Sequence, residues 1–121
     1  MRTTASRISA LLLAMAFMAE AGAHAFLDRA TPAVGSAIRE SPARVQLRFT
    51  QELEGAFSTV RVLDRDGKQV DKGDKRVDPA NRTLLQVSLP PLAPGRYRVV
   101  WRVLSVDTHV TEGDFTFDLA P

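Results

Sequence analysis

Apolar and polar residues alternate in short stretches along most of this chain. Val45, Leu47 and Phe49 alternate with polar neighbours, which is the period of a strand that buries one face. Further strands are predicted at residues 57–63, 84–89, 96–104 and 115–119. No long segment repeats its apolar residues at the helical spacing. A succession of short strands of this kind predicts an all-β sandwich or barrel.

Turn-forming and polar segments separate the predicted strands. Asp66-Gly67 supplies the positive φ that a tight hairpin turn needs. Residues 71–82 are rich in Asp, Lys and Arg and are expected to form a solvated loop.

Tyr97 and Trp101 share one strand face and are expected to be buried, as in immunoglobulin-like cores. Neither an internal repeat nor a linker is present, so a single domain is predicted.

The first residues of the chain follow a different pattern. A basic start is followed by an apolar run over residues 8–18 and then by the small residues Ala21 and Ala23. This order is typical of a secretory signal peptide that is cleaved after Ala23. The run is shorter than the roughly 20 apolar residues that span a bilayer. We therefore expect residues 1–23 to be removed on export to the periplasm or out of the cell, and residues 24–121 to form the mature domain.

Composition narrows the chemistry available to the mature domain. The chain has no cysteine, and its three methionines all lie within the first 18 residues. The mature domain would therefore offer no sulfur ligand, no thiol nucleophile and no disulfide. Basic and acidic residues are intermixed, and the formal net charge is only +2. Nucleic acid is therefore not an expected partner.

Two histidines remain after residue 23, and both stand where they could chelate a metal ion. Cleavage would give His24 a free α-amine beside its imidazole. If the segment after residue 104 is extended, Asp107 and His109 project to the same side, because residues two apart share a face. Three nitrogens and one oxygen suit Cu(II), and next Ni(II), rather than Mg or Ca. The competing interpretation is that His109 is an ordinary surface residue and that the Asp-x-His spacing is accidental.

These residues are also part of a wider resemblance. Residues 24–120 resemble, over nearly their whole length, the CopC family of periplasmic copper-resistance proteins. The shared features are His24, residues 31–36 and 45–50, the Pro-Gly-x-Tyr turn at 94–97, the Trp-Arg-Val-x-Ser-x-Asp-x-His run at 101–109 and Gly-Asp-Phe-Thr-Phe at 113–117. The resemblance implies a small Greek-key β-barrel or sandwich with an immunoglobulin-like fold.

The resemblance further implies a ligand set and a role. His24, Asp107 and His109 would hold one Cu(II), in a protein of copper resistance and homeostasis that serves an inner-membrane copper transport partner. Some members of the family add a Met-rich Cu(I) site, which the mature sequence lacks the methionines to form. Many members carry Glu after the early strand, where this chain has Gln51 followed by Glu52. The role of these two residues near the copper ion is therefore left open.

Two other classes of function are compatible with the sequence. Copper-dependent polysaccharide monooxygenases also pair an N-terminal histidine with a second histidine, but Asp107 would fill a position that oxygen chemistry needs open. A metal-free immunoglobulin-like interaction module would use neither histidine. The sequence shows no nucleophile–base pair or phosphate-binding loop, and Ser105 near His109 does not make a triad by adjacency alone. We therefore expect a monomer that binds copper ion and is not an enzyme.

Overall fold

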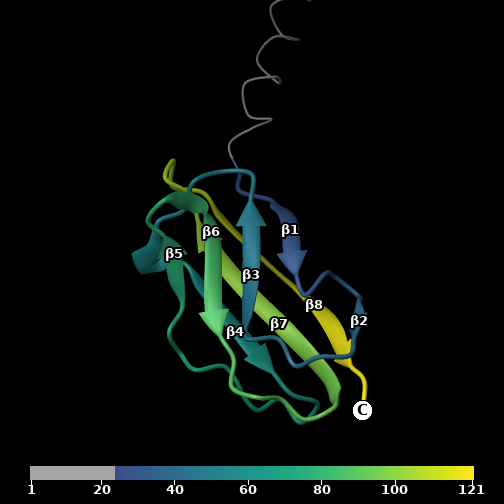
Figure 1. Ribbon diagram of the computed structural model, residues 1–121. Helices are drawn as coiled ribbons and strands as arrows, with labels where there is room; N and C mark the ends of the chain where they lie inside the picture. Colours follow the sequence, from purple (N-terminus) through teal and green to yellow (C-terminus); the bar gives the residue numbers. More distant parts are fainter. Residues whose placement is uncertain (1–23) are drawn as a thin grey trace, which may run out of the picture.

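The computed structural model describes residues 24–121, which form two β-sheets packed face to face (Figure 1). One sheet has the strand order β1 (Leu27–Thr31), β3 (Arg44–Phe49), β6 (Asn81–Ser88), β5 (Arg76–Asp78). The other has the order β2 (Ala37–Ile38), β8 (Val110–Leu119), β7 (Gly95–Leu104), β4 (Thr59–Leu63). In this part of the chain the helical structure is one 3-10 turn, η1 (Gly55–Phe57), and no helix is long and apolar enough to cross a membrane.

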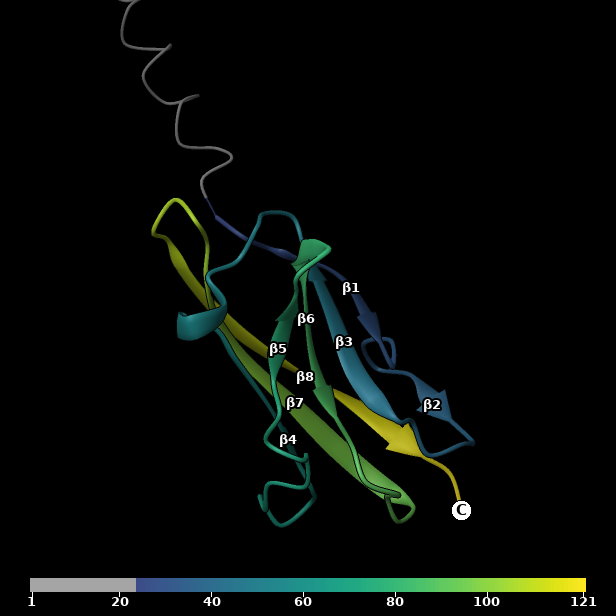
Figure 2. The same ribbon diagram turned by 60° about the vertical axis from the view of Figure 1, so that its left-hand side comes forward.

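The strand connections are those of an immunoglobulin-type sandwich. Neighbouring strands pair antiparallel in both sheets, except that β2 runs parallel to β8. Short β2 therefore attaches the beginning of the chain to the second sheet, while β1 belongs to the first. The two layers are seen from another side in Figure 2. The predicted all-β, Greek-key, immunoglobulin-like architecture is confirmed.

The apolar residues of the alternating strands fill the space between the two sheets. Val45, Leu47 and Phe49 of β3 are buried, and the residues between them face outward. The opposite sheet contributes the inward residues of β7 and β8, which are Tyr97, Val99, Trp101, Val103, Phe115, Phe117 and Leu119. Phe49 meets Trp101 edge-on across the core, with ring centroids 5.1 Å apart. Apolar burial of this kind is the main stabilising term in a chain that has no cysteines.

Residues 71–82 are not the loop that their polarity predicts. They contain strand β5 and the first residues of β6, which pair with each other around a tight connection. The strand β5 lies at the edge of its sheet, so its charged side chains remain in water while its backbone hydrogen-bonds to β6. Val77 packs against the core from this edge. Strand β4 likewise begins at Thr59, later than predicted, because η1 occupies the residues before it.

Tyr97 connects the beginning of β7 to the turn that precedes this strand. Its hydroxyl donates a hydrogen bond to the Ala93 carbonyl, 2.5 Å away, and its ring stacks on Phe117 with centroids 5.6 Å apart. A tyrosine that bonds back to the backbone at this strand entry is a feature of immunoglobulin-like sandwiches. The core tryptophan differs from the antibody arrangement, in which it lies on strand C, the strand that follows B in the chain; counted in the same way that strand is β4, whereas Trp101 lies on β7.

Gly113 lies directly across from Trp101 on β8, and a substitution there tests the packing. A Cβ at residue 113 would come within 2.6 Å of the Trp101 ring. We predict that Gly113→Ala lowers the free energy of unfolding by about 1–3 kcal/mol, as overpacking does. Gly55→Ala is the matched control, because its added Cβ would lie 3.5 Å from its nearest neighbours. Urea denaturation measures both variants, and equal stabilities would contradict this account of the core.

Candidate metal centre

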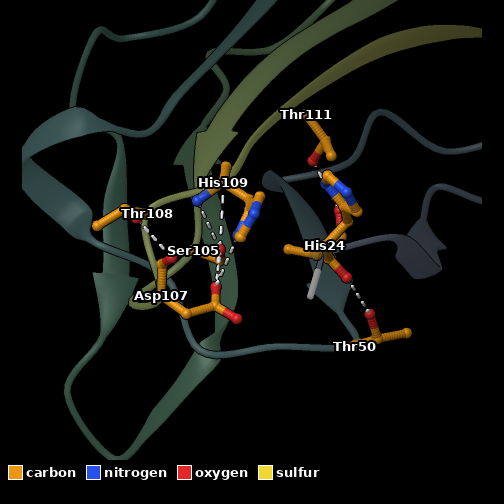
Figure 3. Close-up of polar contacts among 8 residues, drawn as sticks. His24, Thr50, Ser105, Asp107, Thr108, His109 and Thr111 are labelled. Atoms are coloured by element: carbon orange, nitrogen blue, oxygen red, sulfur yellow. Dashed lines mark hydrogen bonds and ion pairs between the residues drawn. The ribbon is translucent and has the colours of Figure 1, made fainter. Parts of the chain in front are cut away.

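His24, Asp107 and His109 come together at one end of the sandwich. The described chain begins there, beside the loop between β7 and β8, while the C-terminus lies at the other end (Figure 1). The imidazole rings of His24 and His109 have centroids 4.7 Å apart and are inclined at 67°. The Asp107 carboxylate lies on the other side of His109, with its Oδ1 3.7 Å from His109 Nδ1 (Figure 3). Two histidines that are 85 positions apart in the chain thus lie side by side.

His24 is held in place through the two residues that follow it. Ala25 is fully buried, and its carbonyl accepts a hydrogen bond from the Thr111 hydroxyl at 2.6 Å. The amide of Phe26 donates to the Thr50 hydroxyl at 2.9 Å, and the Thr50 amide donates to the Phe26 carbonyl at 2.9 Å. Thr50 and Thr111 therefore attach residues 24–26 (the chain start) to the end of β3 and to β8. Neither residue was predicted from the sequence to belong to the site, because each contact joins segments far apart in the chain.

The loop between β7 and β8 is a turn and not the extended segment that the sequence argument assumed. The Thr108 amide donates to the Ser105 carbonyl at 2.9 Å, and the Ser105 amide donates to the His109 carbonyl at 3.0 Å. Thr108 itself has a φ of 71°, in the left-handed region that β-branched residues avoid. Asp107 and His109 do converge, but they do so across this turn rather than along one face of a strand.

Ser105 lies beneath the turn and is fully buried. Its hydroxyl donates a hydrogen bond to Asp107 Oδ1 and accepts one from the His109 amide at 3.2 Å. This serine was not among the predicted site residues, yet it contacts two of the three predicted ligand residues, Asp107 and His109. The sequence did contain a signal for this residue. Every second residue from Tyr97 to Val103 points inward, and Ser105 is the next position in that series but has a polar side chain.

Electrostatics at the site favour a cation. The hydrogen bond from Ser105, more than the nearby imidazole of His109, lowers the pKa of the Asp107 carboxyl from its ordinary value. The His109 Nδ1 atom is buried and has no hydrogen-bond partner, since 3.7 Å to Asp107 is too long for a hydrogen bond. A buried polar nitrogen without a partner is costly unless something binds it.

The spacing of these atoms fits a shared ion. Two donors that each lie about 2 Å from one metal ion are within about 4 Å of each other, which accommodates the 3.7 Å between Asp107 Oδ1 and His109 Nδ1. Among residues 24–121, no three His, Cys, Asp or Glu side chains are gathered closely enough to hold a metal ion by themselves. Gln51 is partly buried and Glu52 is exposed, and the Glu52 carbonyl accepts a hydrogen bond from the Val106 amide at 3.0 Å.

Comparison with known proteins identifies the family. The CopC domain family matches residues 27–120. The chain belongs to the CopC family. Copper resistance protein C of Pseudomonas syringae pv. tomato is 32% identical over 109 residues, which cover 85% of this chain and 86% of that protein. The CopC family resemblance read from the sequence is thereby confirmed.

Solved structures of CopC relatives share the fold. The crystal structure of CopC from Methylosinus trichosporium OB3b has a TM-score of 0.73 and 38% identity, covering 81% of this chain and 95% of that chain. PcoC from Escherichia coli, described as a methionine-rich copper resistance protein, has a TM-score of 0.67 and 30% identity, covering 79% and 98%. The copper transport protein CutJ of Bacillus subtilis is 28% identical over 90% of this chain, which spans only 20% of that longer protein.

The predicted signal peptide, residues 1–23, lies outside the described residues. Its cleavage, and with it the free α-amine of His24, therefore stays a prediction. Within the described residues, the three predicted ligand residues are neighbours, with Ser105, Thr50 and Thr111 as the residues that hold them.

Thr111→Val tests how the chain start is held, because it removes the hydroxyl and keeps the side-chain shape. We predict a loss of about 1 kcal/mol in the free energy of unfolding, together with weaker nuclear Overhauser contacts between the rings of His24 and His109. Thr116→Val, five positions further along β8, is the control and should leave those ring contacts unchanged. Undiminished ring contacts in Thr111→Val would show that Thr111 does not hold the chain start.

Proposed function

We propose that residues 24–121 are a periplasmic copper-binding protein of copper resistance and homeostasis that binds one Cu(II). The ligands are the α-amine and imidazole of His24, the carboxylate of Asp107 and the imidazole of His109. The observation that carries this proposal is the approach of the His24 ring to His109, whose buried Nδ1 has no hydrogen-bond partner and faces an ionised carboxylate. Membership of the CopC family supports copper as the ion.

The donor set favours the cupric ion. Three nitrogens and one carboxylate oxygen match the tetragonal preference of Cu(II), whereas thioether and thiolate sulfur select Cu(I). Residues 24–121 contain neither cysteine nor methionine. PcoC is described as methionine rich, so this domain and PcoC differ in the sulfur ligands that they can offer to a metal ion. A Met-rich Cu(I) site is therefore not part of this proposal.

Each ligand residue has a distinct task. Asp107 supplies negative charge, and its lowered pKa keeps the carboxylate ionised as the pH falls. His109 supplies a neutral ring nitrogen, and His24 supplies two nitrogens once its amine is free and deprotonated. The exposed apolar side chains of Phe26, Val106 and Val110 belong to the same end of the molecule. Apolar surroundings of this kind limit the access of water to a bound ion.

The proposed role is binding and transfer rather than catalysis. Asp107 would occupy a coordination position that oxygen activation needs open, which argues against the monooxygenase alternative. In CutJ, a domain similar to this chain makes up about one fifth of a copper transport protein. By that analogy, the monomeric protein passes its copper to an inner-membrane copper transport partner.

A copper titration followed by native mass spectrometry tests the ligand set. The exported protein should begin at His24 and take up one tightly bound Cu(II). His24→Ala and His109→Ala should each weaken binding by at least about 100-fold, more than the loss of a supporting residue does. Asp114→Asn is the control, because that carboxylate pairs with Arg98 on the outer sheet face. A different first residue, or unchanged affinity in either histidine variant, would refute the proposed site.

Chemical capping of the α-amine separates the amine from the imidazole of His24. Acetylation of the mature protein should weaken Cu(II) binding. It converts the α-amine into an amide, and an amide nitrogen that keeps its proton does not bind a metal ion. In the uncapped protein the affinity should fall as the pH is lowered, since protons compete with copper for the nitrogen donors. Isothermal titration calorimetry measures both effects. Equal affinity with and without the cap would exclude the amine as a ligand.

A further inference from the structure

We infer that Ser105 is the positioning residue of the metal centre, and that its buried hydroxyl holds the Asp107 carboxylate and the His109 backbone in a binding arrangement before any ion arrives. The inference deepens the proposed function, on which it rests for the identity of the ligands. It assigns a role to a residue that binds no copper itself.

Ser105 makes hydrogen bonds to three residues of the loop, Asp107, Thr108 and His109. Its hydroxyl donates to Asp107 Oδ1 and accepts from the His109 amide at 3.2 Å (Figure 3). Its own amide donates to the His109 carbonyl at 3.0 Å, and its carbonyl accepts from the Thr108 amide at 2.9 Å. The backbone bonds fix the turn, and the hydroxyl adds the one link to a ligand carboxylate.

Ser105 is the buried residue of the loop, and the exposed side chains around it are positioned relative to it. Ser105 is fully buried, whereas the side chains of Asp107 and His109 are 47% and 43% exposed. An exposed carboxylate would otherwise sample several rotamers, and a bound ion would have to select one of them at an entropic cost. A hydrogen bond from a buried, immobile hydroxyl removes much of that freedom in the metal-free protein.

Thr108 shows that the turn is imposed by its surroundings. A β-branched residue at a φ of 71° is unfavourable, and it persists only when neighbouring contacts determine the backbone. The Thr108 amide bonds to Ser105 on one side, and the His109 amide that follows bonds to the Ser105 hydroxyl. The strained residue therefore lies between the two ligands and is held from both sides by Ser105.

Ser58 provides a matched control for a purely structural effect. Ser58 is also fully buried, and its hydroxyl accepts a hydrogen bond from the amide of Leu104 at 3.1 Å, next to Ser105 in the chain. Ser58→Ala and Ser105→Ala each remove one buried acceptor of a backbone amide. They differ in that only Ser105 contacts the Asp107 carboxylate.

The test compares the copper complexes of the two alanine variants. Ser105→Ala should weaken Cu(II) binding by about 10–100-fold, the usual effect of losing a supporting hydrogen bond to a ligand. It should also change the g and hyperfine values of the Cu(II) electron paramagnetic resonance spectrum. Ser58→Ala should keep the parent spectrum and affinity even if it is less stable to urea. A Ser105→Ala protein with parental affinity and spectrum would overturn the inference.

A measurement on the metal-free parent can overturn the inference even if Ser105→Ala does not fold or the parent binds no copper. Positioning before binding requires backbone order parameters of about 0.85 at residues 106–109, as in rigid structure. Values below about 0.6 would overturn the inference. Failure of the parent to bind copper, by contrast, would refute the proposed function while leaving a rigid loop in place.

Discussion

The pairing of β7 with β8 is the constraint on which the rest of this structure depends. The two strands match residue for residue from Gly95 with Leu119 to Leu104 with Val110. Their inward side chains form one wall of the core, and the loop that joins them carries Asp107 and His109. Because the ladder runs to the last residue before Ser105, that loop begins and ends on fixed backbone. The position of these two proposed ligand residues is thus set by the longest strand pair in the domain.

The other half of the site is brought to this loop by the packing of the chain start. Ala25 is buried, and its carbonyl bonds to Thr111 on β8, while Phe26 pairs with Thr50 after β3. These contacts are the reason that the His24 ring lies 4.7 Å from the His109 ring. A metal ion bound at the proposed site would require little reorganisation, because folding already holds the residues around it. Such a site would need no large enclosing cavity.

Much of this arrangement was predictable from the sequence, and the failures have physical causes. Strands such as β3 and β7 bury one face, so their alternation identifies them directly, and the family motifs predict the three proposed ligand residues, which the fold places near one another. Strand β5 was missed because an edge strand keeps its charged side chains in water and leaves no apolar period. The turn at Thr108 was missed because its left-handed backbone is imposed by Ser105 and is not favoured by threonine itself. The anchors Thr50 and Thr111 act across the fold, where local patterns carry no information.

Electron–nuclear double resonance on the Cu(II)-loaded, exported protein tests the central claim most directly. Protein labelled with ¹⁵N only in histidine would report which histidine nitrogens bind the ion. We expect strong couplings from both imidazoles and from a third histidine nitrogen, the α-amine of His24. Strong couplings from the imidazoles alone would remove the N-terminal amine from the site. The absence of any strong histidine coupling would contradict copper binding at this site.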